Sequence, residues 1–170
     1  LHGALKVSGS PALPVASGQF RGENLILRLP DQALHLTRGE LDIELSNNLL
    51  RVKRLSFDSV LQNLPKALLR SEKLDVAALT KTPGKLEISG EMQVDRNKGA
   101  DRAFLDIKLD RLGAYQLPDQ WVVVSGDGRL NWENDTLGIR GKLAADAGYW
   151  QLAKAGTPTL SDDVVIKQKT

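Results

Sequence analysis

The chain has 170 residues, of which 41% are hydrophobic, enough for one domain with its own core and too many for a disordered segment. Its net charge is only +2 and aromatic residues make up 5%, so the basic, aromatic surface typical of a nucleic-acid-binding protein is not expected. The absence of cysteine excludes disulfides, thiolate chemistry and cysteine-type zinc sites.

Apolar and polar residues alternate along most of the chain. A period of two is typical of β-strands that have one dry face. The apolar members, in chain order, are Leu5/Val7, Leu25/Leu27/Leu29, Leu41/Ile43/Leu45, Leu50/Val52, Leu55/Phe57, Leu86/Ile88/Met92/Val94, Leu105/Ile107/Leu109, Val122/Val124, Leu130/Trp132, Leu137/Ile139/Leu143 and Val164/Ile166. Ten or so short strands of this kind predict an antiparallel sandwich, a barrel or an extended sheet.

Short breaks containing Gly, Asn or Asp separate these runs, as at Ser46–Asn48 and Glu133–Asp135. Such residues tolerate the backbone geometry of tight hairpins. Gly126-Asp127-Gly128 begins like a dinucleotide-binding loop, but the third glycine is missing and a strand pattern follows where a helix is required. We interpret it as a hairpin turn.

One interval has a different spacing. Between Asn63 and Leu79 the apolar residues lie three or four positions apart, which predicts a short helix near residues 63–80. Asn63 is the expected N-cap, Pro65 fits a first turn, and Thr82–Gly84 ends the helix. This helix is expected as an insertion in a single β domain spanning residues 1–170.

A phrase of the form Gly-x-Leu-x-(Val/Ile)-Ser-Gly occurs twice, at Gly3–Gly9 and Gly84–Gly90. Parts of it return at Val124–Gly126 and Ile139–Leu143. Glycine inside a strand pattern marks a bulge, a bend or a close backbone approach, although any single one is as readily a turn glycine. The repetition favours a repeated β unit whose glycines let the sheet curl.

Residues for catalysis or metal binding are scarce. His2 and His35 are the only histidines, and His35 lies in the strand pattern Ala33–Leu36, where a satisfied or exposed position is the ordinary case. No metal-ligand spacing or nucleophile elbow occurs, and Asp162-Asp163 has no third oxygen ligand nearby in the sequence. We therefore expect no enzyme activity, no metal, no cofactor and no nucleic-acid partner.

No apolar run is long enough to span a bilayer, and no signal peptide precedes Leu1. The strand-like run Val164–Ile166 stops close to the last residue. The chain is expected to be a segment of a larger protein, truncated at both ends, with its anchor outside it.

The stretch Gly141–Leu152, followed by Gly156–Val165, resembles a signature of the TamB family, in which a Gly-aromatic pair precedes a Pro-x-Leu-Ser-Asp-Asp-Val-Val phrase. Leu117–Gly126 is similar to β-proteobacterial members, and Gly3–Gly9 is similar to the generic repeat of the family. The resemblance covers most of the chain except residues 63–82, and it points to the C-terminal region of the family.

The resemblance implies a β-taco fold, a long sheet curled into a half-pipe with an apolar inner face. It also implies a periplasmic segment of a protein that is anchored in the inner membrane elsewhere and partners with TamA, an outer-membrane barrel protein. Members are implicated in phospholipid transport to the outer membrane and in assembly of outer-membrane proteins and autotransporters. The family has no catalytic residues to carry over.

Combined with this resemblance, the alternation predicts that the apolar residues collectively line a groove that contacts phospholipid acyl chains. The expected lining residues are Leu41, Ile43, Leu86, Ile88, Leu105, Ile107, Leu130, Trp132, Ile139 and Leu143. Two alternatives remain open: an assembly scaffold that pairs client strands along an exposed edge, and a structural β-segment with a sealed core.

Overall fold

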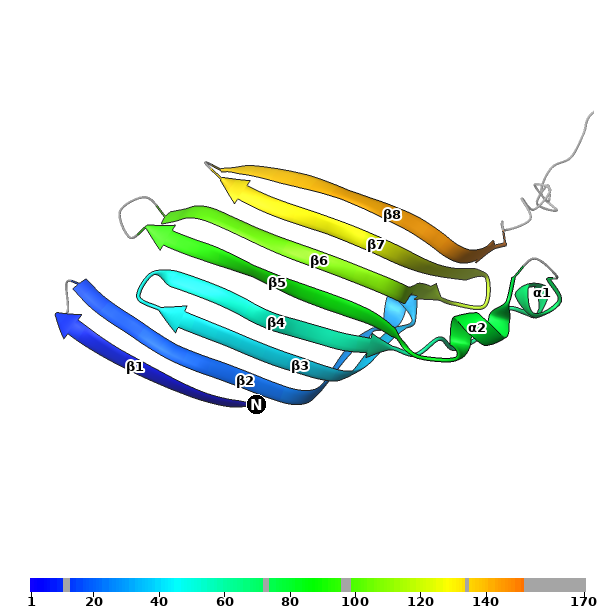
Figure 1. Cartoon of the computed structure of the whole chain (residues 1–170), viewed down its shortest axis with the longest axis horizontal. Coiled ribbons are helices and arrows are strands. Elements are labelled where there is room, and N and C mark those ends of the chain that lie inside the picture. The colour runs from blue at the N-terminus through cyan, green and yellow to red at the C-terminus, as the bar shows by residue number, and fades with distance from the viewer. Residues whose placement is uncertain (11–12, 72–73, 96–98, 134, 152–170) are drawn as a thin grey trace, which may run out of the picture.

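The computed structural model describes residues 1–151 apart from 11–12, 72–73, 96–98 and 134. Eight antiparallel strands form one open sheet in which each strand lies beside its neighbours in the chain (Figure 1). The strands are β1 (His2–Ser10), β2 (Leu13–Leu29), β3 (Leu34–Ser46), β4 (Leu49–Ser59), β5 (Gly84–Asp95), β6 (Gly99–Gln116), β7 (Gln120–Glu133) and β8 (Thr136–Trp150). A 3-10 helix, η1 (Pro30–Gln32), joins β2 to β3. The expected curled all-β sheet is confirmed; the run Val164/Ile166 and the phrase Gly156–Val165 lie outside the described residues.

The strands are fewer and longer than the sequence indicated, because bulges interrupt the alternation without ending a strand. The runs Leu50/Val52 and Leu55/Phe57 both belong to β4, and the register with β5 shifts between Val52 and Leu55. Counting each break in the alternation as a turn therefore overestimated the number of strands.

The pairing register places the apolar positions on one face of the sheet. Residues directly opposite each other in an antiparallel pair point to the same side. One such row reads Phe20, Ile43, Val52, Gly90, Leu105, Leu130 and Ile139 from β2 to β8. We call the side of this row the inner face and the opposite side the outer face.

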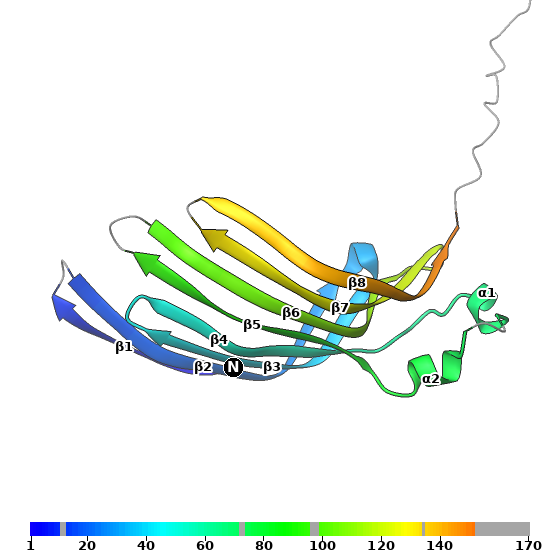
Figure 2. The same ribbon diagram turned by 45° about the horizontal axis from the view of Figure 1, so that its top comes forward.

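The sheet bows so that the inner face is concave (Figures 1 and 2). Bulges accompany this bend, and Asn24 in β2, Arg38 in β3 and Arg111 in β6 have φ of 55°, 49° and 47° there. The tip of the β2–β3 hairpin folds across the inner face, where η1 and β3 contact β6. Leu36 is fully buried under this fold.

Gly126-Asp127-Gly128 is not the predicted hairpin turn. It lies within β7, which continues from Gln120 to Glu133 and pairs with both neighbouring strands. Gly126 has φ of 148°, and a Cβ there would lie 2.1 Å from the carbonyl oxygen of Lys142. Close packing of β7 and β8, and not a chain reversal, requires glycine at this position.

The predicted helical insertion is present as two short helices, α1 (Lys66–Leu69) and α2 (Val76–Thr80). Asn63 is not an N-cap: it has φ of 52°, and its side-chain amide donates a hydrogen bond to the Gln116 carbonyl oxygen. Asp75 caps α2 by accepting a hydrogen bond from the Ala78 amide. Proline at position 65 precedes α1 in extended conformation, so the first turn starts later than predicted.

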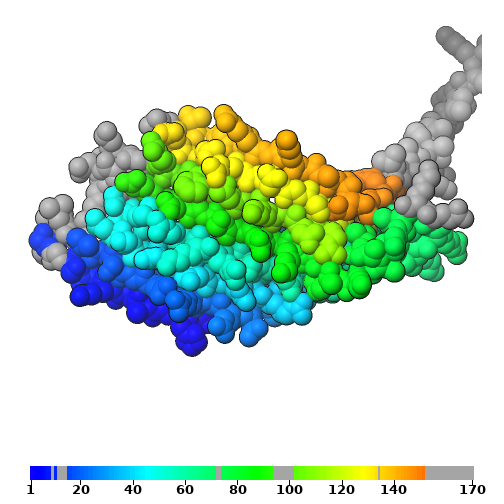
Figure 3. All heavy atoms as spheres, viewed as in Figure 1, coloured from blue at the N-terminus to red at the C-terminus, as the bar shows by residue number. Residues whose placement is uncertain are grey.

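The insertion packs on the outer face at one end of the sheet. Leu79 lies against Trp121, Val123 and Ala147, and partly buried leucines of residues 61–74 surround them. The indole of Trp121 donates a hydrogen bond of 2.8 Å to the carbonyl oxygen of Gln62. In the space-filling view the insertion covers only this end, and the strands run as stripes over the rest of the outer face (Figure 3).

Two inner-face glycines of β7 provide a matched test of this packing. Gly126→Ala is expected to lower the free energy of unfolding by about 1–3 kcal/mol, since the alanine would combine a strained φ with a clash against backbone. Gly128→Ala is expected to leave stability unchanged or raise it by up to about 1 kcal/mol, because a Cβ there meets nothing closer than 3.5 Å. Urea unfolding of both variants measures the difference; equal effects would contradict the close packing at Gly126.

Candidate lipid-contacting face

The register brings all the predicted lining residues to the inner face. Leu41, Ile88 and Ile107 share one row across β3, β5 and β6, with Leu55 of β4 between them. Ile43, Leu105, Leu130 and Ile139 share a second row, Leu86 and Leu143 share a third, and Trp132 lies in a fourth. The alternation therefore placed these side chains correctly relative to one another.

Charge is absent from this face in the described strands. Among the residues whose side chains are described, the register assigns to it Leu, Ile, Val, Met, Phe, Trp, Ala and Gly, together with Ser59, Tyr115 and Gln120. Ser59 is fully buried, and its hydroxyl oxygen accepts a hydrogen bond from the Gly113 amide. The face therefore offers a ligand dispersion contacts and apolar surface, with few polar groups to fix its position.

No second layer covers most of this face within the described residues. Side chains in the middle of the sheet, such as Leu41 and Ile107, are half-buried by their own neighbours. At the rims the exposed fraction rises to 55% for Leu5 in β1 and to 72% for Ile139 and 68% for Leu143 in β8. Contiguous exposed apolar surface is typical of protein, membrane or ligand interaction sites.

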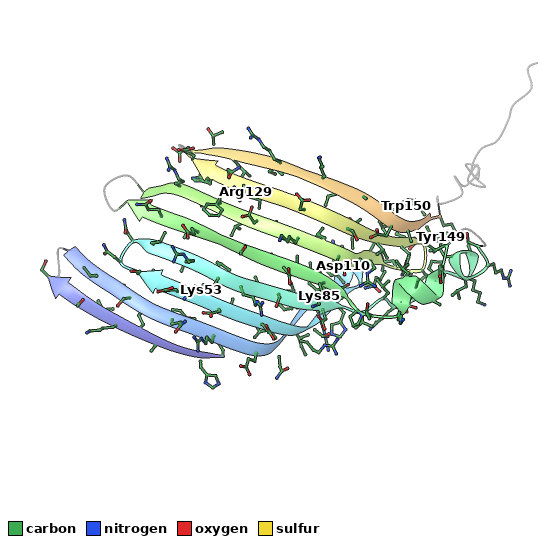
Figure 4. All side chains as sticks on the ribbon, in the orientation of Figure 1. Lys53, Lys85, Asp110, Arg129, Tyr149 and Trp150 are labelled. Carbon is green, nitrogen blue, oxygen red and sulfur yellow. The ribbon has the colours of Figure 1, made fainter. Side chains whose placement is uncertain are left out.

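Aromatic side chains with a polar group lie near both ends of the inner face. Trp132 lies at one end of β7. At the other end, Tyr115 packs edge-on against Trp150 with their ring centroids 6.1 Å apart, and β8 ends there beside the labelled Tyr149 (Figure 4). The sequence reading missed Tyr115 and Trp150 as lining, because bulges in β6 and β8 shift the alternation just before them. Rings with an apolar body and a polar tip suit the boundary between apolar and wet surroundings.

The outer face carries the charged residues as cross-strand pairs. Lys53 lies 2.7 Å from Glu44, Arg51 lies 2.6 Å from Glu91, and Arg129 bonds Asp106 at 2.5 and 2.6 Å. The hydrogen bond from Lys53 lowers the pKa of Glu44, and that from Arg129 lowers the pKa of Asp106. These pairs are exposed to water, so each adds little stability.

A hollow of about 1270 Å³ lies among the charged side chains over β5–β8. Basic and acidic residues both line it. The basic residues are Lys85, Lys108, Arg129, Arg140 and Lys142, and the acidic residues are Glu87, Asp106, Asp110 and Asp127. Because these charges nearly cancel, the hollow has no strong preference for an anion or a cation.

The remaining chemical candidates do not converge. The His35 ring accepts a hydrogen bond of 3.3 Å from Arg28 at an outer-face position, as expected for a satisfied strand histidine. Among the described residues, no three His, Cys, Asp or Glu side chains gather closely enough to hold a metal ion. The pair Asp162-Asp163 lies outside the described residues.

Comparison with protein-family models, with curated proteins and with solved structures gives no match for this chain. In the described part of the chain, no helix has the length and apolar character needed to cross a membrane.

The pair Asp106–Arg129 gives the outer face a defined pH response. Because the folded-state pKa of Asp106 lies below its unfolded value of about 3.9, the pair stabilises the fold at neutral pH and loses its effect as pH falls through the folded pKa. Asp106→Asn is expected to lower the urea midpoint slightly at pH 7 and not at all once the native aspartate is protonated. Asp127→Asn is the control, because Asp127 has no ion pair within 4 Å among the described residues. The difference in urea midpoint between this variant and the native chain is expected to be the same at pH 7 and in acid. A deficit for Asp106→Asn that persists unchanged in acid would contradict this account.

Proposed function

We propose that the chain binds phospholipid through its inner face and forms part of a route along which phospholipid moves between the inner and outer membranes. The observation that carries the proposal is a concave face, spanning eight strands, that bears no charged side chain and is left mostly uncovered by the described residues. A sealed core would require a second apolar surface over it.

Burial energetics favour an apolar occupant. A large aliphatic side chain left in water forgoes roughly 1.5–3 kcal/mol relative to full burial. Ile139 and Leu143 are among the most exposed, so an acyl chain laid beside them would recover part of that energy. Each methylene that leaves water contributes about 0.8 kcal/mol. A few contacts of this size suffice to hold a lipid tail.

The same face suits movement as well as binding. Hydrophobic attraction is non-directional, so a tail that moves across the face exchanges Ile107 for Leu105 of the same strand, or for Leu130 of β7, at little cost. Groups that could form directional hydrogen bonds with a lipid, such as Tyr115 and Trp150, lie near the ends of the face. The middle of the face has only apolar side chains and glycine, which form no such bonds. A uniform lining between distinct ends is a feature of a conduit.

The resemblance of Gly3–Gly9 and Gly141–Leu152 to the TamB family supports the same proposal. On this proposal the segment lies in the periplasm, belongs to a protein anchored in the inner membrane, and takes part in outer-membrane biogenesis. A TamA-like barrel protein would be the partner of the full-length protein. The described fold, a single curled sheet, is the one that the resemblance implies.

The experiment is lipid extraction and mass spectrometry on the chain purified from a bacterial periplasm without detergent. We expect near-stoichiometric phospholipid, and at least a several-fold loss in Ile139→Asp, because a carboxylate beside an acyl chain must be desolvated. Ile139 is 72% exposed, so the substitution is expected to leave the fold intact.

Asn131→Asp is the matched control, since Asn131 lies on the outer face of β7 beside the Leu130–Ile139 pair. It introduces the same charge a few ångströms away without touching the inner face. Far-UV circular dichroism and the melting temperature of all three proteins exclude unfolding as the cause. A lipid-free native chain, or equal lipid loss in both variants, would refute the lipid proposal.

The alternative function is a scaffold that assembles client outer-membrane strands by edge pairing. Its specific support is that β1 and β8 each have only one neighbour among the described strands, which leaves two long edges open. This function predicts sensitivity to proline on an edge strand, whereas the lipid proposal predicts sensitivity to charge on the inner face.

A further inference from the structure

The open edge of β8 is unusually regular. From Thr136 to Ala145 the strand pairs with β7 without a register shift, and this segment has no proline. Its inner-face residues are apolar or glycine, and Ile139 and Leu143 are largely exposed because no strand pairs with β8 on this side within the described residues. Of the usual protections of an edge, the segment has outward-pointing charges at Arg140 and Lys142, and it has no bulge, proline or inward-pointing charge.

Arg140 and Lys142, the two cations on the outer side of this edge, have no ion-pair partner among the described residues. Arg140 lies directly opposite Arg129, whose guanidinium already binds Asp106 in two hydrogen bonds. Lys142 lies opposite Asp127 with no ion pair within 4 Å, and Arg140 has none either in the described part of the chain. Like charges directly opposite each other destabilise a sheet. The remaining side of Arg140, toward the open edge, is where an acid could compensate.

The sheet shows how such a basic strand is matched elsewhere. In β4, Arg51, Lys53 and Arg54 form a basic series on the outer face. The neighbouring β3 presents acids at alternate positions, and Lys53 and Arg54 lie 2.7 and 3.2 Å from Glu44 and Glu40. The residues between these acids, Leu41 and Ile43, point to the inner face. A strand of alternating acidic and aliphatic residues is thus the partner that this sheet already uses beside a basic strand.

We propose that the β8 edge binds an extended strand of a partner protein that presents carboxylates opposite Arg140 and Lys142 and aliphatic side chains on the inner face. The backbone of the partner continues the ladder, its acids neutralise the two unpaired cations, and its aliphatic residues cover Ile139 and Leu143. The inference rests on the proposed function in one respect, since those aliphatic residues would extend the lipid-contacting face beyond β8.

The β1 edge does not offer the same site. Its outer face carries Lys6, which lies opposite Ser17, so no repulsion comparable to that between Arg129 and Arg140 calls for an acid there. A second copy of the chain is a poorer occupant of the β8 edge in the register centred on Gly141, because that register would place Arg140 of each copy opposite Lys142 of the other. The charge pattern therefore selects an acidic partner over self-association.

The test uses the full chain and a fluorescent peptide containing Glu-Leu-Asp-Ile-Glu-Leu, the sequence of residues 40–45, with a Lys-Leu-Lys-Ile-Lys-Leu peptide as its charge-reversed counterpart. Anisotropy is expected to show binding of the acidic peptide only. The variant carrying Arg140→Glu and Lys142→Glu is expected to bind the acidic peptide with an affinity about tenfold or more lower, and to bind the basic peptide. The reason is that two cross-strand charge pairs change from attraction to repulsion for the acidic peptide and the reverse for the basic one. Lys6→Glu on the β1 edge is the control and is expected to change neither affinity.

An acidic peptide N-methylated at every backbone amide separates strand addition from simple charge attraction, because it has no N–H group to donate to the backbone ladder. Equal binding of the methylated peptide, or no binding of the acidic one, would overturn the proposal. So would self-association of the chain in sedimentation that the double reversal abolishes. Peptide binding needs no lipid: a chain that binds the peptide but carries no phospholipid would refute the lipid proposal alone, and the opposite result would refute only the edge site.

Discussion

The structure depends on one constraint: a strand sends alternate side chains to opposite faces, and every strand here pairs in the register that keeps its apolar set on the same side. A slip of one residue between Ile88 and Ile107 would place Lys108 on the inner face and an isoleucine among the outer charges. The outer ion pairs reinforce this register, since Arg129 meets Asp106 only when Leu130 meets Leu105. Each of these pairs is weak by itself, but each opposes the same error.

Curvature follows from where the sheet departs from regularity. A concave face crowds its side chains, and the inner positions of β7 and β8 include Gly126, Gly128 and Gly141, which have no side chain to crowd. The bulges at Asn24, Arg38 and Arg111 add local twist. At Arg111 the bulge is braced: its amide donates to the Ser125 hydroxyl, and its guanidinium reaches Asp110 and Thr82 at the end of the insertion. The bend is therefore tied to the end of the insertion that carries α1 and α2.

The sequence predicted the face of each lining residue, because the alternation of side chains along a strand determines which side of the sheet each one points to. This alternation can be recognised from neighbouring residues alone. Every predicted residue from Leu41 to Leu143 lies on one side of the sheet. The positions of the bulges were not predicted, since an extra residue such as Lys53 reads like the end of a strand. Gly126-Asp127-Gly128 was misread for the same reason: glycine suits a turn as well as a close strand pair, and only the neighbouring strand decides between them. The outer position of Trp121 was equally hidden, because its cover comes from residues some sixty positions earlier, at Gln62.

The uncovered face and the open edges are two results of the same architecture. A sheet that buries its apolar side against its own second layer can close, and closure removes edges. In the described part of the chain the sheet is a single layer that does not close, so it has one edge at β1 and another at β8. Those edges are exposed where the inner face is also most exposed, at Leu5 and Val7 on β1 and at Ile139 and Leu143 on β8. A strand added at either edge would complete the backbone ladder and shield these side chains at once. In such an architecture, a bound lipid would cover inner-face side chains that an added strand leaves exposed. An added strand would in turn cover the side chains at the rim that a bound lipid leaves exposed.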